Sequence, residues 1–158
     1  MAATPKLTSI RDALVDLFEA ELTGPSSANY WYDTTVEEGI IDLSKLAGIE
    51  KPIIAVRRMS DGPSEDSPIG AHRKRRIATF IVDGYINTTG NRTAIERLAR
   101  DVWQAITTDA DLSCNTESIN QGTVTYEDDE VMDIGDATAT LRSHFEMTLE
   151  ITYTETYS

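Results

Sequence analysis

Two histidines and one cysteine are the side chains of this sequence best suited to acid–base or nucleophilic chemistry. His144 stands between Arg142 and Glu146 in an alternating stretch, so in a strand these three side chains share one face. His144 could then act as a general base that Glu146 orients. An ion pair between neighbouring strands is the more common arrangement on such a face. We therefore assign no catalytic residue and predict that the chain is not an enzyme.

The single cysteine and the absence of known catalytic motifs also favour a protein that is not an enzyme. Cys114 is the single cysteine, so it can form no intramolecular disulfide, and the chain has no cysteine cluster for zinc. Its neighbours Ser113 and Asn115 indicate a loop, in which the thiol is a bystander. Phosphate-binding, dinucleotide-binding, nucleophile-elbow and zinc-protease motifs are all missing from the sequence. We predict no cofactor.

An acidic run, Glu127 to Glu130, with Asp133 and Asp136 close by, is the best candidate for metal binding. Carboxylates suit Ca²⁺ or Mg²⁺, but the run lacks the ligand spacing and the fixed glycine of a calcium loop. A solvated acidic turn is the simpler interpretation, and we predict no metal site.

Charge is distributed unevenly along the chain. The formal net charge is −13, which excludes a dedicated nucleic-acid binder. No lysine or arginine occurs between Arg100 and Arg142, whereas His72–Arg76 forms a compact basic run. Opposite charges on different segments suit contacts between copies of one subunit, although solvated faces are the alternative. The predicted interface joins Arg57, Arg58, Arg73, Lys74, Arg75 and Arg76 of one copy to Glu127, Asp128, Asp129 and Glu130 of the next.

Two helices are expected to position these residues. Apolar residues at three- and four-residue spacing predict a helix over 5–22, which Gly24-Pro25 ends. A second helix is predicted over 93–106, where Thr93 and Glu96 have the spacing of a capping box.

The other elements are expected to be strands. Residues 53–59 and 72–87 predict an antiparallel hairpin with a long 60–71 loop, and 122–126 predicts a further strand. Nearly perfect alternation over 141–153 indicates a half-buried strand, long enough to project from the domain or to pair with another chain. The whole chain, 1–158, is then one α+β domain of order α-β-β-α-β-β. Both helices lie on one face of an antiparallel (mixed) sheet.

Residues 23–52 show no clear periodicity. Their main feature is an aromatic triplet, Tyr30, Trp31 and Tyr32. It is either a contact patch for a partner or a strand or loop that covers the core.

No apolar run is as long as a membrane span, which needs about 18–20 residues. Arg11, Asp12 and Asp16 interrupt the first apolar pattern, so we expect no signal peptide and a cytoplasmic protein.

Taken in order, these elements resemble the tail terminator proteins of tailed bacteriophages, which complete the tail and join it to the head. The resembling segments are TSIRDALVDLFEAEL, IIAVRR, RRIATFIVDGYIN, TAIERLARDVWQAI and TATLRSHFEMTLEITYTE. The resemblance rests on the pattern of helices and strands rather than on invariant residues. It implies a small α+β subunit of the virion tail or neck, assembled in the host cytoplasm, without enzymatic activity or cofactor.

The same resemblance implies particular partners. The chain would form a homohexameric ring on the tail tube, stop tube polymerisation and present a surface to the head–tail connector protein. DNA would pass the acidic lumen without specific binding. The segregated charge and the long loop lead to a further hypothesis, in which Tyr30, Trp31 and Tyr32 and the 60–71 loop contact the tube or the connector. Alternatives are another neck component, a tail-tube subunit, a small hydrolase that uses His144, or an acidic adaptor.

Overall fold

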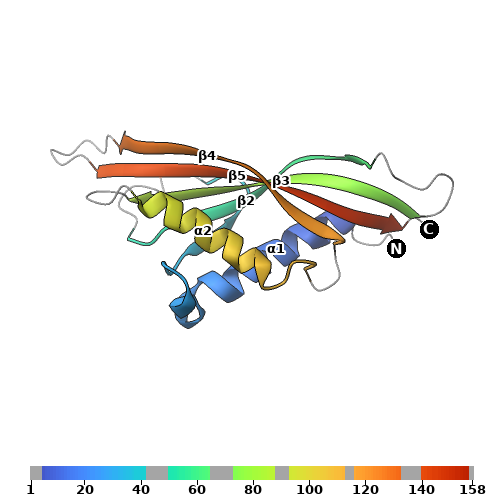
Figure 1. Cartoon of the computed structure of the whole chain (residues 1–158), viewed down its shortest axis with the longest axis horizontal. Coiled ribbons are helices and arrows are strands. Elements are labelled where there is room, and N and C mark those ends of the chain that lie inside the picture. Colours follow the sequence, from blue (N-terminus) through green and yellow to red (C-terminus); the bar gives the residue numbers. More distant parts are fainter. Residues whose placement is uncertain are drawn as a thin grey trace.

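Two helices cover one face of a five-stranded sheet (Figure 1). A computed structural model describes residues 5–41, 50–64, 73–87, 93–112, 116–132 and 140–156. The sheet order is β1-β2-β3-β5-β4. The elements are α1 (Lys6–Leu22), the 3-10 helix η1 (Gly24–Asn29), β1 (Thr35–Glu38), β2 (Ile53–Pro63), β3 (Arg73–Asn87), α2 (Ala94–Thr107), β4 (Ser118–Met132) and β5 (Thr140–Thr156). The predicted α+β class, with both helices on one face, is confirmed.

The helices begin and end close to their predicted positions. Pro5 precedes α1, and the chain leaves that helix through Gly24, whose φ of 68° suits glycine.

The predicted capping box at the start of α2 is wrong. Thr93 has a helical backbone conformation (φ −88°, ψ −3°) and makes no side-chain capping bond. An N-cap residue needs an extended conformation to direct its hydroxyl at the free amides, and Thr93 does not adopt one.

The pairing of β3 with β5 forms the middle of the sheet. It is antiparallel and runs without interruption from Arg73 opposite Thr156 to Asn87 opposite Arg142. Alternate residues of both strands face the helices, as predicted for β5. The largest buried side chains of the core are Tyr153, Phe18, Phe80 and Phe145. Because β4 pairs with the other side of β5 between Thr140 and Thr152, β5 is an interior strand over that stretch.

Three segments differ from the prediction. β1 was not expected; it pairs in parallel with β2 and makes the sheet mixed. The β2 strand continues through Ser60–Pro63, which had been assigned to the long loop, because these residues pair with β3. Residues 65–72, the rest of that loop, lie outside the described residues. The acidic run Glu127–Glu130 belongs to β4 and is not a turn.

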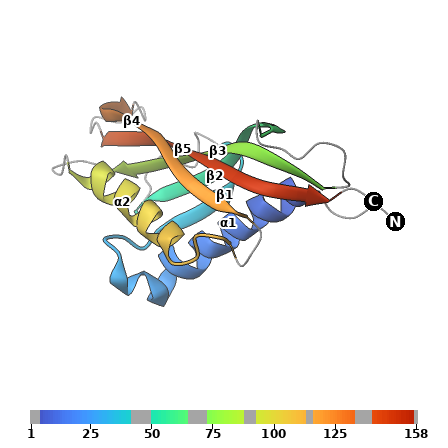
Figure 2. The ribbon, with the colours of Figure 1, turned by 45° about the vertical axis from the view of Figure 1, so that its right-hand side comes forward.

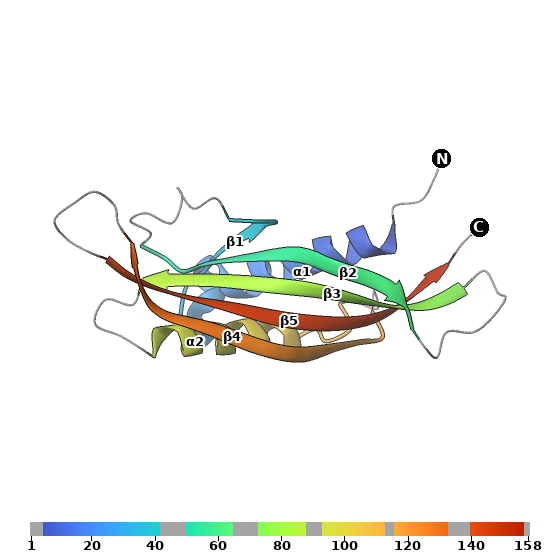
Figure 3. The same ribbon diagram turned by 90° about the horizontal axis from the view of Figure 1, so that it is seen from above.

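The sheet face opposite the helices is partly buried as well. Figures 2 and 3 show both helices on the same side, which leaves the other face open to view. A small apolar cluster of Ile41, Ile53 and Ala55, with Tyr85 packed against it, covers part of this second face. Polar residues of β3 and β5 continue the same face beyond that cluster.

The close contact between β3 and β5 at Gly84 gives a stability prediction. Gly84 stands opposite Phe145, and a methyl group added there would lie 2.6 Å from Cζ of the ring, and nearer still to the adjoining ring carbon. We expect Gly84→Ala to lower the free energy of unfolding by about 1–3 kcal/mol, measured by urea denaturation. Gly62→Ala is the matched control, because its methyl group would enter open space. Equal stability of the two variants would contradict the packing argument.

Candidate functional site

A group of interacting charged residues lies on the sheet face that the helices leave uncovered. Asp83 of β3 stands directly opposite Glu146 of β5, and Tyr85 stands opposite His144. Nε2 of His144 lies 3.4 Å from Oδ1 of Asp83. Both side chains are largely buried, with exposed fractions of 13% for His144 and 10% for Asp83. The strand register alone therefore brings an imidazole and two carboxylates together.

Arg57 of β2 supplies positive charge to both carboxylates. Its Nε donates to Oδ2 of Asp83 at 2.7 Å, and its Nη2 lies 3.4 Å from Oε1 of Glu146. Burial raises the pKa of Asp83, but hydrogen bonds from His144 and Arg57 outweigh it, so this pKa lies below its ordinary value. Asp83 is thus held as a carboxylate.

The orientation of the His144 ring is fixed from two sides. The ring stacks on Tyr85 with centroids 4.3 Å apart and planes 2° from parallel. Its Nδ1 lies 3.8 Å from Oε2 of Glu127, which reaches across from β4. The guanidinium of Arg142 lies 5.2 Å from the centroid of Tyr85. His144 therefore faces carboxylates across both neighbouring strands, which confirms the predicted cross-strand pairing.

The basic residues of the predicted interface do not form one patch. Arg75 and Arg76 are neighbours in β3, so they point to opposite faces of the sheet. Arg75 pairs with Glu117 at 3.0 Å, and Arg76 pairs with Asp61 at 3.1 Å. With Arg57 paired to Asp83, three of the basic residues of the predicted interface have partners within their own chain.

Two basic residues of that predicted set have no ion-pair partner among the described residues, namely Arg58, which is exposed, and Lys74, which is half-buried. The side chains of Arg73, Asp128, Asp129 and Glu130 lie outside the described residues, as do His72, Cys114, Asp133 and Asp136. In the acidic run, Glu127 is 68% exposed.

The aromatic triplet is divided between the core and the surface. Tyr30 and Tyr32 pack against the core, and the Tyr30 hydroxyl donates to Glu21 at 2.9 Å. Trp31 is 57% exposed, and the guanidinium of Arg97 lies 4.4 Å from its ring centroid. The contact of this segment with a partner stays a prediction, and Trp31 is the most exposed side chain of the triplet.

Asp101 of α2 holds this aromatic segment in place. Its side chain is buried, and its two oxygens accept the backbone N–H groups of Trp31 and Tyr32, each at 3.0 Å. Burial raises the pKa of Asp101, which those hydrogen bonds oppose. A recess of about 310 Å³ lies beside Asp101. Its lining consists of Ala28, Asn29, Tyr30, Trp31, Arg100, Asp101 and Gln104.

Asp83 and Tyr85 were not identified from the sequence. One signal was available: Asp83 is an acid within the apolar segment IATFIVDGYI, and a buried acid requires a partner. That partner could not be read from the pattern, because Arg57 lies 26 residues away and His144 lies 61 residues away.

No protein-family model matches this chain, and no curated protein sequence matches it. Within the described residues, no helix has both the length and the apolar character required to cross a bilayer.

The lowered pKa of Asp83 predicts a pH dependence of stability. A carboxylate with a folded-state pKa below its unfolded value of about 3.9 stabilises the fold above that pH, and this stabilisation is lost as pH falls through the folded pKa. We expect Asp83→Asn to lower the free energy of unfolding by about 1–3 kcal/mol at pH 7, and by less at pH 3.

Urea denaturation at both pH values measures this difference. Asp12→Asn is the matched control, because the Arg11–Asp12 pair lies on the surface, where Asp12 is 53% exposed. An equal loss of stability for Asp83→Asn at both pH values would contradict the assignment.

Proposed function

We propose that this chain is a structural subunit that assembles head-to-tail into a closed ring and acts as a tail terminator of a tailed phage. The observation that supports this best is the presence of two unlike free edges on opposite sides of one sheet. A head-to-tail contact requires two different complementary surfaces, and it closes into a ring when the rotation between copies allows.

The first edge is β4 and the second is the outer half of β2. Among the described residues, β4 pairs only with β5. β1 covers β2 only over Ile53–Val56, so Arg57–Pro63 has no strand on its outer side within the described part of the chain. The sheet order places these two edges at opposite sides of the domain (Figure 3).

The two edges carry opposite charge. Arg58 is exposed on the β2 edge and helps to line a recess of about 410 Å³. Glu127 is exposed on the β4 edge, where the sequence continues with three further acids, Asp128–Glu130. In this proposal Arg58 of one copy faces the acidic run of the next. Arg75 and Arg76, which have partners within the chain, contribute little to the contact.

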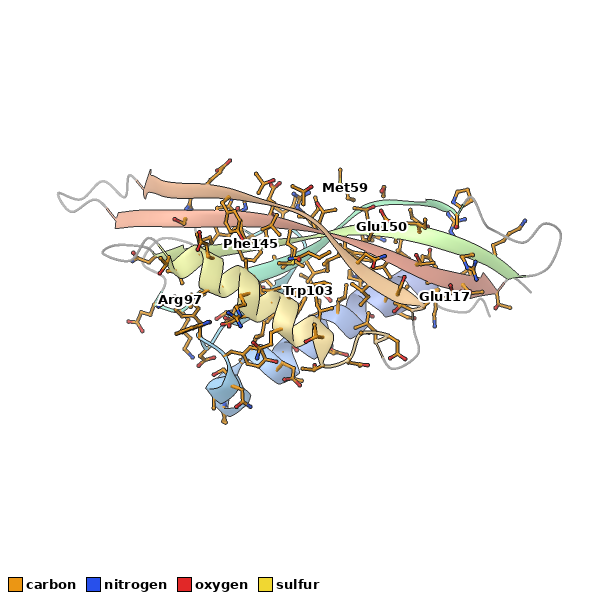
Figure 4. The ribbon with its side chains drawn as sticks, viewed as in Figure 1. Met59, Arg97, Trp103, Glu117, Phe145 and Glu150 are labelled. Atoms are coloured by element: carbon orange, nitrogen blue, oxygen red, sulfur yellow. The ribbon has the colours of Figure 1, made fainter. Side chains whose placement is uncertain are left out.

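Exposed apolar side chains accompany the charges. Met59, which is 65% exposed, and Ile40, which is 86% exposed, lie in or beside the β1–β2 side of the sheet, and Tyr126, which is 42% exposed, lies in β4. Figure 4 shows Met59 pointing away from the helices. Protein interfaces combine an apolar centre with a charged rim, and these residues supply both.

The remaining parts of the proposal come from the resemblance to tail terminators. The ring is hexameric, stacks on the last layer of the tail tube and presents its other side to the connector. Trp31 is the aromatic residue available for one of these partners. An acidic ring lumen repels DNA phosphates, which suits a net charge of −13.

A charge reversal tests the ring contact. We expect Arg58→Glu to weaken self-association about tenfold, because it places like charges across the contact. Light scattering at low salt measures the assembly. Glu127→Lys should weaken it similarly, and the double variant should restore it. The matched control is Arg75→Glu, which removes an ion pair within the chain and should leave assembly unchanged.

Negative-stain images then separate the proposed function from its alternatives. Single closed rings support a terminator, whereas long tubes would indicate a tail-tube subunit. A protein that stays monomeric at high concentration and low salt, both alone and with tail tubes, would contradict the proposal.

A further inference from the structure

The uncovered sheet face holds a set of ligand atoms suited to a divalent transition metal, and we propose that Asp83, His144 and Glu146 bind Zn²⁺ there. One ligand atom from each of these residues lies within 4.8 Å of the other two. An imidazole nitrogen with carboxylate oxygens is a donor set that zinc accepts. The site shares Glu127 with the proposed ring contact, but zinc binding by a single chain requires neither ring formation nor a tail function.

The spacing of the first two ligands fits a shared ion. Oδ1 of Asp83 and Nε2 of His144 are 3.4 Å apart, which is long for a hydrogen bond, whose usual length is about 2.9 Å. Two ligands that each lie about 2.1 Å from a tetrahedral zinc ion are about 3.4 Å apart. Glu146 is 45% exposed, so its long side chain can rotate to complete the set.

The groups around these ligands match the usual surroundings of a zinc site. A histidine that binds metal through one nitrogen commonly donates the other N–H to a carboxylate, and Glu127 lies 3.8 Å from Nδ1 of His144. Tyr85 stacks on the ring and fixes its plane. Arg57 bonds to Oδ2 of Asp83, which leaves Oδ1 for the ion. Both ligands are therefore oriented in advance.

The carboxylates around the site and its open position on the sheet also favour the binding of a cation. Three carboxylates, those of Asp83, Glu127 and Glu146, lie around His144. The guanidinium of Arg57 contacts Asp83 and Glu146, and that of Arg142 lies over the ring of Tyr85. Three protein ligands leave a fourth coordination position for water, on the face that the helices do not cover (Figure 2).

Titration of the untagged 158-residue chain with zinc chloride, followed by calorimetry, tests the proposal. We expect one zinc ion per chain and loss of detectable binding in His144→Ala. Glu146→Gln changes a half-exposed side chain, so it tests the site with little risk to the fold, and it should weaken binding at least about tenfold. Glu127→Gln removes the support behind the histidine and should weaken binding about tenfold.

Two matched controls make the result specific. Glu150→Gln changes an exposed acid of β5 on the same sheet face (Figure 4), and His72→Ala removes the other histidine of the chain. Both should bind zinc as the unchanged protein does. Co²⁺ provides a second readout, because tetrahedral coordination gives a visible absorption band that His144→Ala should abolish.

Three results would each overturn the proposal. They are the absence of stoichiometric zinc binding by the unchanged protein, unaltered binding in a folded His144→Ala variant, and loss of binding in His72→Ala. Circular dichroism establishes that each variant is folded before titration.

Discussion

The uninterrupted register between β3 and β5 is the constraint on which the rest of the structure depends. Each residue from Arg73 to Asn87 has a fixed partner in β5, and side chains alternate between the two faces of the sheet. A slip of one residue would move the apolar set of β5 from the helices to the open face. Gly84 opposite Phe145 favours the observed pairing, because the ring occupies the space that any other side chain would need. The core and the polar face are therefore specified together.

The polar face follows from the same register. Two carboxylates, Asp83 and Glu146, stand directly opposite each other, an arrangement that is unfavourable without compensating charge. Arg57 provides that charge from β2, and His144 provides a second hydrogen-bonding group from β5. Because Glu127 approaches from β4, this one cluster contacts all four long strands of the sheet. An ion bound there would bridge β3 and β5, the two strands that carry its ligands.

Periodicity in the sequence predicts most of the elements, and long-range pairing explains the rest. The stripe of α1 and the alternation of β5 are local patterns, so both were predicted correctly. β1 has a single apolar residue, Val36, and exists because its backbone pairs with β2. Ser60–Pro63 has the composition of a loop, but pairing with β3 overrides that preference. The site has the same origin, since Arg57, Asp83 and His144 meet only after three strands have found their register.

The free edges of the sheet explain why charge, and not strand pairing alone, would select a neighbour. β4 has register shifts between Gln121 and Val124 and between Glu127 and Glu130, and β2 has one between Arg58 and Ser60. Bulges of this kind twist an edge and interrupt its row of hydrogen-bonding groups, which discourages the addition of unrelated strands. A continuous ladder between copies is disfavoured for the same reason. In the proposed ring, specific contact would then come from side chains that project across the edges, and opposite charges on the two edges would favour another copy of the same chain.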